Sequence, residues 1–158
     1  SIAEATKSNF VRINVLNNTM FTDQGIIEGK SYEINQFKST LNNVVEIYAD
    51  VFVKHAVPAP GSKIENHAKE LIDRAGADVV IVTGDGTGHE INMDDLEKVR
   101  NIVPEGKLAI GSGVNATNVG AYQDLADILI VGTSFKFDNI VSKKVDINRV
   151  EEIVRKVK

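Results

Sequence analysis

The sequence predicts an α/β fold of parallel βα units that form part of an eight-stranded barrel. Five apolar or alternating runs of strand length are each followed by apolar residues at helical spacing. Strict alternation of strands and helices predicts a parallel sheet with right-handed crossovers. Four polar residues lie inside predicted strands: Arg12, Asn14, Asp50 and Lys54. Such side chains do not suit an open sheet with helices on both faces, but they suit a barrel interior near its mouth. Because closing a barrel takes about eight parallel strands, these five are an incomplete set.

The first third of the chain predicts a strand, a long loop and a helix. Residues 1–8 resemble the last turns of a helix, and residues 10–15 alternate as a strand does. Residues 16–29 predict a long loop, and loops of this length in compact α/β chains are typically lids or binding loops. The apolar positions of the next helix are Ile34, Phe37 and Leu41.

The middle of the chain predicts two more strands. Residues 46–54 alternate, which places Asp50 and Lys54 on the same face of one strand, about 13 Å apart. Residues 78–82 form the third strand, and the glycine-rich segment 83–88 follows it.

Capping residues predict where three helices begin. Ser62 and Glu65 form a capping box, Asn92 precedes a helix over 93–102, and Asp146 precedes the last helix. Gly76 predicts the end of the first of these helices. Their inward apolar positions are, in order, Ile64, Ala68, Leu71, Ile72 and Ala75; Met93, Leu96 and Val99; Val150, Ile153, Val154 and Val157.

Residues 107–136 organise the rest of the chain, because they predict the last two strands with a glycine turn after each. The strands cover 108–110 and 128–131, and a helix with apolar Val119, Tyr122 and Leu125 lies between them. The turns consist of Gly111, Ser112, Gly113 and of Gly132, Thr133, Ser134. Each glycine alone is explained by a turn. Two such turns, one helix apart and rich in free N–H groups and small hydroxyls, predict a phosphate cradle.

Composition excludes several classes of protein. The 158 residues fit one domain, and the net charge of −4 gives no drive toward nucleic acid or anionic lipid. There is no cysteine, which excludes disulfides and permits a reducing cytosol. The apolar runs are too short to span a bilayer and no secretory leader opens the chain, so we expect a cytoplasmic protein that is still compatible with peripheral membrane association.

Several segments in the right order resemble one known family. They are residues 10–16 (FVRINVL), 22–29 (TDQGIIEG), 49–56 (ADVFVKHA), 80–84 (VIVTG), 110–114 (IGSGV), 130–136 (IVGTSFK), 145–146 and 149–150. On these residues the chain resembles the BtpA family, also named SgcQ-like, whose fold is a TIM barrel related to phosphate-binding barrels. The resemblance implies that the five strands are the fourth to eighth of such a barrel, and that the first three are missing. Residues 137–144 depart from the family's pattern, which has an Asn-Pro pair before the Val-Asp.

Four residues at the mouth of the predicted barrel form the candidate catalytic group: Lys54, Asp50, Arg12 and Asn14. Lys54 is the candidate for proton transfer or imine formation, with anion binding as the alternative. We expect Asp50 to pair with Arg12 from the neighbouring strand rather than to act as a base, because an unpaired charge inside the barrel is costly.

Other polar residues have weaker signals. Asn14 and Thr83 end their strands and are candidates for holding ligand hydroxyls. Asp23 and Glu28 lie on the predicted lid and are candidate acids or bases on its closure, although Glu28 also suits the first turn of a helix.

The histidines and the glycine-rich segment give little evidence of a function. His67 is expected on the surface, His55 away from the site, and His89 within reach of a ligand. No set of residues has the spacing of metal ligands, and 83–88 lacks the patterns of nucleotide-binding loops, so we expect neither a metal nor a cofactor.

Three hypotheses follow. The first is an enzyme-type barrel that binds a phosphorylated small molecule, either a sugar phosphate or a nucleoside derivative. The second is a non-enzymatic accessory protein for assembly of a membrane complex, because the family is named for a role in photosystem I biogenesis. The third concerns this chain alone: open strand edges predict self-association or strand exchange, or a requirement for the missing strands.

Overall fold

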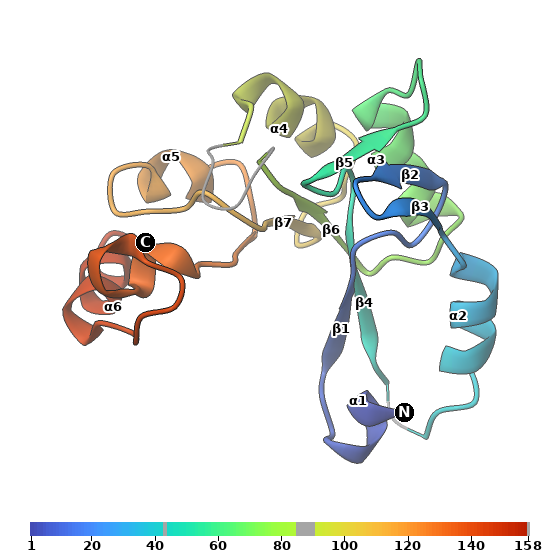
Figure 1. Cartoon of the computed structure of the whole chain (residues 1–158), viewed down its shortest axis with the longest axis horizontal. Coiled ribbons are helices and arrows are strands. Elements are labelled where there is room, and N and C mark those ends of the chain that lie inside the picture. The colour runs from blue at the N-terminus through green and yellow to red at the C-terminus, as the bar shows by residue number, and fades with distance from the viewer. Residues whose placement is uncertain (43, 85–90, 158) are drawn as a thin grey trace.

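A computed structural model describes residues 1–42, 44–84 and 91–157, and its largest sheet has five parallel strands. Along the sheet the strands lie in the order β1 (Phe10–Ile13), β4 (Glu46–Asp50), β6 (Val79–Val82), β7 (Leu108–Ile110) and β8 (Ile128–Leu129). All four neighbouring pairs are parallel. The predicted α/β fold with a parallel sheet is confirmed (Figure 1).

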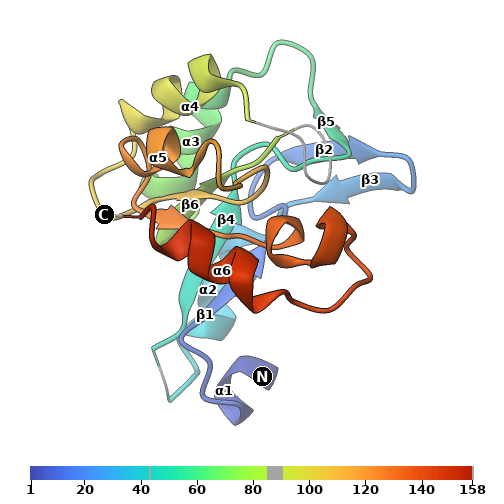
Figure 2. The same ribbon diagram turned by 90° about the vertical axis from the view of Figure 1, so that its left-hand side faces the viewer.

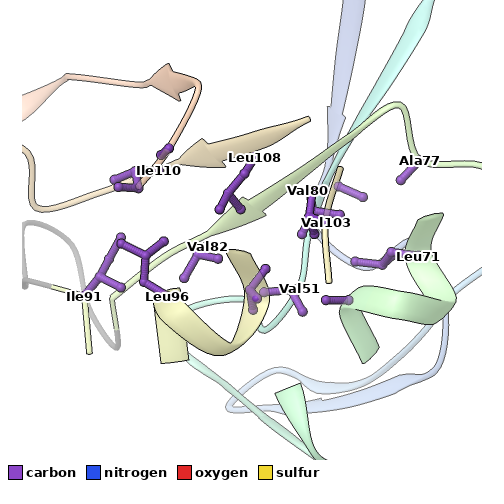
Figure 3. Close-up of a cluster of buried hydrophobic side chains, with 14 of the residues drawn as sticks. Val51, Leu71, Ala77, Val80, Val82, Ile91, Leu96, Val103, Leu108 and Ile110 are labelled. Atoms are coloured by element: carbon purple, nitrogen blue, oxygen red, sulfur yellow. The ribbon is translucent and has the colours of Figure 1, made fainter. Parts of the chain in front are cut away.

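The helices are α1 (Ile2–Ala5), α2 (Ser31–Lys38), α3 (Ile64–Asp73), α4 (Met93–Arg100), α5 (Val119–Gln123) and α6 (Ile147–Val154), and the 3₁₀ turns η1 (Thr133–Phe135) and η2 (Phe137–Asn139) lie between β8 and α6. Residues of α2 to α6 belong to the main core, on one face of the sheet. Alternate strand residues point into the main core, where Val80 and Leu108 meet Leu71 of α3 and Leu96 of α4 (Figure 3).

The opposite face of the sheet has a core of its own. Val79, Ile81 and Ala109 are buried there, and the described hydrophobic side chains packed against them, Tyr48, Ile128 and Ile130, all lie outside the helices. Asp50 follows the buried Ala49 on β4 and therefore points to this second face. Helices cover one face of the sheet, and the polar side chains of the strands lie on the other face. The barrel interpretation requires this arrangement.

The long loop predicted over 16–29 is wrong, because most of it forms a β-hairpin. β2 (Thr19–Thr22) and β3 (Gly25–Glu28) pair antiparallel, and β2 also pairs with β5 (Ala56–Pro58). Met20 points inward and is buried. In Figure 1 this three-stranded sheet lies beyond the carboxyl ends of β1 and β4.

The second predicted strand is too long. β4 ends at Asp50, and the last bond of its ladder runs from the Val51 N–H to the Ile81 carbonyl. The chain then turns and enters the second sheet as β5, with His55 in the left-handed region at φ 61°. Lys54 therefore lies in a connection rather than on the same strand face as Asp50.

Two of the three predicted caps are confirmed. The Asn92 and Asp146 side chains accept hydrogen bonds from the N–H groups of Asp94 and Asn148. The capping box at Ser62 is wrong, since α3 begins at Ile64 behind Lys63 without a side-chain cap. The Ser62 N–H instead donates to the Ala59 carbonyl in a turn.

The apolar stripe predicted for the last helix is only partly covered. Ile153 is buried, whereas Val154 and Val157 are exposed. Met93, predicted to face inward on α4, is also exposed. Gly76 ends α3 as predicted, at a positive φ of 76°.

Two aspartates fix the amino ends of neighbouring strands in the same way. Asp78, before β6, accepts from the Ile47 N–H and from Lys38 Nζ, both at 2.8 Å. Asp127, before β8, accepts from the Leu108 N–H at 2.9 Å and from Arg100 at 2.8 Å. Burial opposes ionisation of both carboxyls, but these hydrogen bonds outweigh it and hold both pKa values below their ordinary range.

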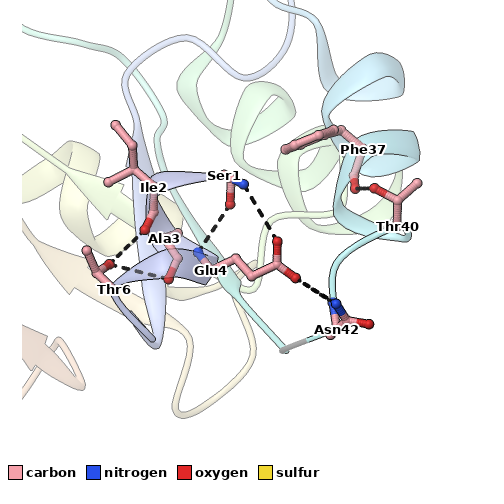
Figure 4. A network of polar contacts seen from close by, with 8 residues as sticks. All are labelled: Ser1, Ile2, Ala3, Glu4, Thr6, Phe37, Thr40 and Asn42. Carbon is pink, nitrogen blue, oxygen red and sulfur yellow. Dashed lines mark hydrogen bonds and ion pairs between the residues drawn. The ribbon is translucent and has the colours of Figure 1, made fainter.

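The first turn of the chain is tied to the connection after α2. Glu4 accepts hydrogen bonds from the backbone and side chain of Asn42, and Ser1 caps α1 through the Glu4 N–H (Figure 4). In Figure 1 these contacts lie at the bottom, at the amino ends of β1 and β4, and the C-terminal helix α6 lies at the left, on the side that faces the viewer in Figure 2. The residues described next lie at the opposite, carboxyl ends of the strands.

Candidate anion-binding site

A cavity of about 620 Å³ opens at the carboxyl ends of the parallel strands. It brings together eight of the predicted site residues: Arg12, Lys54, Gly111, Ser112, Gly113, Gly132, Thr133 and Ser134. Segments as far apart in the sequence as β1 and η1 thus meet in one place. The cavity's size lies within the range of small-molecule sites.

Charge distinguishes this cavity. Its lining includes the cations Arg12, Lys54 and Arg149, and no aspartate or glutamate among the residues that the structure describes. The chain as a whole carries a net charge of −4, so this concentration of positive charge is local. Such a cavity attracts anions.

Arg12 is held in place by two polar neighbours. Its Nε and Nη2 donate to Asp50 Oδ1 at 3.1 and 2.9 Å, and Nη2 also donates to Oδ2 at 3.1 Å. Asn14 Nδ2 donates to Asp50 Oδ2 at 2.7 Å. The Asp50 side chain is fully buried and that of Arg12 is 30% exposed. The expected pairing of Asp50 with Arg12 is present, and it positions the guanidinium at the cavity.

The electrostatics of Asp50 reflect its burial. Burial raises the pKa of the Asp50 carboxyl above its ordinary value, while the charge and hydrogen bonds of Arg12, the Asn14 amide and the charge of Lys54 limit the rise. With both oxygens occupied by hydrogen bonds, Asp50 supports Arg12 and does not itself line the cavity.

The sheet is strongly curved, as the position of the Arg12 side chain shows. β1 and β7 are three strand steps apart, about 14 Å in a flat sheet. Yet Arg12 Nη2 lies 3.1 Å from the point that a Cβ on Gly111, directly after β7, would occupy. The guanidinium therefore crosses the concave face, and Gly111 leaves room for it.

The two glycine turns offer unused backbone donors. Within the described ranges, the N–H groups of Ser112, Gly113, Gly132, Thr133 and Ser134 make no hydrogen bond to another residue. The Ser112 hydroxyl accepts from the Gly84 N–H at 2.8 Å, and the Ser134 hydroxyl donates to the Val114 carbonyl at 2.6 Å. The hydroxyls fix the turns, while the N–H groups are free for an anion.

Arg149 is the main site residue that the sequence analysis missed. It lies on α6, and its Nε donates to the Ser134 carbonyl at 2.8 Å while its Nη2 donates to the Asn139 side chain. Asn115 and Thr117 also line the cavity. The available signal for Arg149 was its place three residues after the cap Asp146, in the first α-helix after the last glycine turn.

Three other candidates lie outside this cavity. Thr83 donates its hydroxyl to the Phe52 carbonyl at 3.1 Å and lines a neighbouring cavity of about 400 Å³ that also includes Lys54. Asp23 lies in the turn of the β2–β3 hairpin, Glu28 ends β3, and both are exposed. Glu28 is thus a strand residue and not a first-turn helix acid.

The expectation that His67 lies on the surface is wrong. His67 is buried on α3, edge-on to the Phe52 ring at 5.2 Å between centroids. Burial lowers the pKa of its imidazole, against a smaller raising effect of Glu70, and so favours the neutral ring. His55 lines the 400 Å³ cavity, and His89, like residues 85–88 of the glycine-rich segment, lies outside the described residues.

The described residues meet the requirements of neither a metal site nor a membrane-spanning helix. No group of three His, Asp or Glu residues there is arranged to hold a metal ion. No described helix has the length and apolar character needed to cross a bilayer.

Comparisons with known proteins relate the whole chain to one family. The model of the BtpA family matches residues 1–158. An uncharacterised protein of Pyrococcus horikoshii is 40% identical over 158 residues, which cover 100% of this chain and 60% of the relative. A protein of Synechocystis sp. named "Photosystem I biogenesis protein BtpA" is 35% identical over 154 residues, covering 98% of this chain and 54% of that protein. The chain spans a little over half the length of these relatives.

Two solved structures resemble this chain in their fold. N-(5′-phosphoribosyl)anthranilate isomerase from Pyrococcus furiosus aligns with a TM-score of 0.60 and 18% identity, covering 98% of this chain and 64% of that one. 3-Hexulose-6-phosphate synthase from Salmonella typhimurium aligns with a TM-score of 0.63 and 16% identity, covering 99% and 64%. At these identities the likeness concerns the fold alone, and both neighbours are TIM-barrel enzymes.

Proposed function

The chain belongs to the BtpA family, and we propose that it forms the anion-binding part of a barrel that takes a phosphorylated small molecule. The observation that carries the proposal is the 620 Å³ cavity, lined by three cations and two glycine turns with free N–H groups. The two solved neighbours are both named for phosphorylated sugars, which supports the same chemistry.

The lining favours a sugar phosphate over a nucleoside derivative. Amide and hydroxyl side chains surround the cavity, among them Asn115, Thr117 and Asn139. Among the described lining residues there is no Phe, Tyr or Trp on which a base would stack. Polar groups of this kind suit a polyhydroxylated ligand.

The roles we propose divide the cavity in two. The turns Gly111–Gly113 and Gly132–Ser134 hold phosphate through their N–H groups. Lys54 and Arg12 face the other end of the ligand, with Asp50 and Asn14 positioning Arg12. Thr83, Asp23 and Glu28 contact the ligand only if the hairpin and neighbouring loops move toward it.

Substitution of Gly132 by valine tests the phosphate site. A Cβ on Gly132 meets no atom within 4 Å, so a larger side chain there enters open space beside the free N–H groups. We expect Gly132→Val to weaken the binding of a sugar phosphate such as ribose 5-phosphate at least tenfold, which is about 1.4 kcal/mol. Isothermal titration calorimetry measures the affinity.

Gly120→Val is the matched control, because Gly120 also has open space around it but lies on α5, outside the cavity lining. Thermal unfolding of both variants checks that they fold. Equal affinities in wild type and Gly132→Val would remove the proposed phosphate site.

The second candidate function is assistance in assembling a membrane complex, and the name of the Synechocystis relative favours it. This function would not use the cavity's chemistry. It therefore predicts stable co-purification with a membrane complex that Lys54→Ala leaves intact, whereas the first proposal places Lys54 against the ligand.

We propose further that the five parallel strands correspond to the fourth to eighth strands of a barrel. β1 and β8 are the edges of the parallel sheet, and Phe10 of β1 is 47% exposed. Unpaired strand edges and apolar side chains on them promote association. We expect this chain on its own to self-associate, and a monodisperse monomer in light scattering at micromolar concentration would contradict this.

A further inference from the structure

Two cations of the cavity form no ion pair with a described carboxylate, and they come from distant elements. Lys54 follows β4, and Arg149 lies on α6, after β8. Arg149 is hydrogen-bonded to Ser134, which follows β8, and two strands, β6 and β7, separate β4 from β8 in the sheet. Lys54 and Arg149 thus belong to different sides of one cavity.

The Arg149 side is a complete site for one anionic group. Arg149 is fixed by the Ser134 carbonyl and the Asn139 side chain, and it makes no ion pair with a described residue. The free N–H groups of Gly132, Thr133 and Ser134 lie on the same turn. One positive charge and three donors therefore surround this position.

The Lys54 side holds a second net positive charge. Arg12 and Asp50 neutralise each other in their ion pair, and Lys54 has no carboxylate within 4.0 Å in the described part of the chain. A ligand with one anionic group at the Arg149 side would leave this charge half-buried and uncompensated.

We propose that the ligand carries two anionic groups, with a phosphate at Gly132–Ser134 and Arg149 and a second phosphate or a carboxylate at Lys54 and Arg12. The inference rests on the proposed phosphate site and adds a second subsite to it. It assigns Lys54 to anion binding instead of imine formation.

Calorimetry with paired probes tests the second subsite. We expect fructose 1,6-bisphosphate to bind at least tenfold more tightly than fructose 6-phosphate, and 3-phosphoglycerate tells whether a carboxylate serves as the second group. Lys54→Met should erase the difference between bisphosphate and monophosphate, whereas Arg149→Met should weaken both. Lys69→Met, on the exposed surface of α3, is the matched control and should keep the difference.

The outcomes separate the two proposals. Equal affinity of wild type for the bisphosphate and monophosphate, or an unaltered difference in Lys54→Met, overturns the second subsite and leaves the phosphate site standing. Failure of inorganic phosphate and of every phosphorylated probe to bind overturns both. Circular dichroism of each variant confirms that loss of binding is not loss of fold.

Discussion

Replacing Arg12 with methionine is expected to lower the free energy of unfolding by about 3–5 kcal/mol at pH 7. The Asp50 side chain is fully buried and relies on Arg12 for three of its hydrogen bonds. Methionine keeps the length of the side chain but leaves the buried carboxylate with Asn14 as its remaining bonded partner. Urea unfolding followed by circular dichroism measures the loss.

The loss depends on pH, and its sign follows from Asp50. Burial already raises the pKa of this carboxyl in the folded chain, and Arg12 opposes the rise. Without Arg12 the pKa rises further, so the folded state binds a proton more tightly than the unfolded state does. Stability from a raised carboxyl pKa is present at low pH and is lost as the pH rises through the folded value. The deficit of Arg12→Met relative to wild type should therefore shrink from pH 7 toward pH 4.

Asp50→Asn provides the matched control. It removes the negative charge instead of the positive one, and Arg12, at 30% exposure, reaches solvent in a way that Asp50 does not. We expect a smaller loss, and we expect the double variant to be more stable than Arg12→Met alone, because no buried charge remains unpaired. A deficit that stays constant with pH, or below about 1 kcal/mol at pH 7, contradicts a buried pair of this importance.

The parallel sheet was predictable because its strands carry strong local signals. Val79–Val82 is apolar throughout and is buried on both faces, as a central parallel strand should be. Arg12 and Asp50 indicated the barrel because they are charged residues within strands, and such residues predict a sheet face that no helix covers. Their pairing then followed from the cost of leaving either charge alone.

The β2–β3 hairpin was missed because its stability is not local. Four-residue strands are too short to show a clear period, and residues 16–29 read as a polar loop. What holds β2 is its pairing with β5, more than 30 residues later, and the burial of Met20. Because β4 ends at Asp50 and β5 begins at Ala56, Lys54 lies in the connection between them. The prediction that Asp50 and Lys54 share one strand face was therefore wrong.

The errors at His67 and Arg149 also come from tertiary structure. His67 was predicted on the surface, yet it lies three residues after Ile64 at the edge of the buried face of α3, where Phe52 from the β4–β5 connection packs against it. Arg149 was not among the predicted site residues, because only the path of the chain after β8 brings it to the Ser134 carbonyl. A sequence period describes a helix's own faces, and it does not say which loop will lie against them.

Gly111→Ala is expected to destabilise the fold by about 1–3 kcal/mol and to weaken phosphate binding at the same time. An added Cβ would lie 2.6 Å from Ile81 Cγ2, 2.9 Å from Thr83 Cγ2 and 3.1 Å from Arg12 Nη2. Gly111 is not among the glycines with positive φ, so lack of space and not backbone strain causes the effect. Urea unfolding and titration with ribose 5-phosphate measure the two consequences.

Gly120→Ala is the control for this substitution, because its Cβ meets no atom within 4 Å and its stability should stay within about 0.5 kcal/mol of wild type or rise. The link between the two effects of Gly111→Ala is the guanidinium. Ile81 is fully buried and cannot retreat, so the added methyl pushes Arg12 away from the cavity. Wild-type stability in Gly111→Ala would mean that Arg12 does not cross the concave face, and the curvature inferred from its position would be wrong.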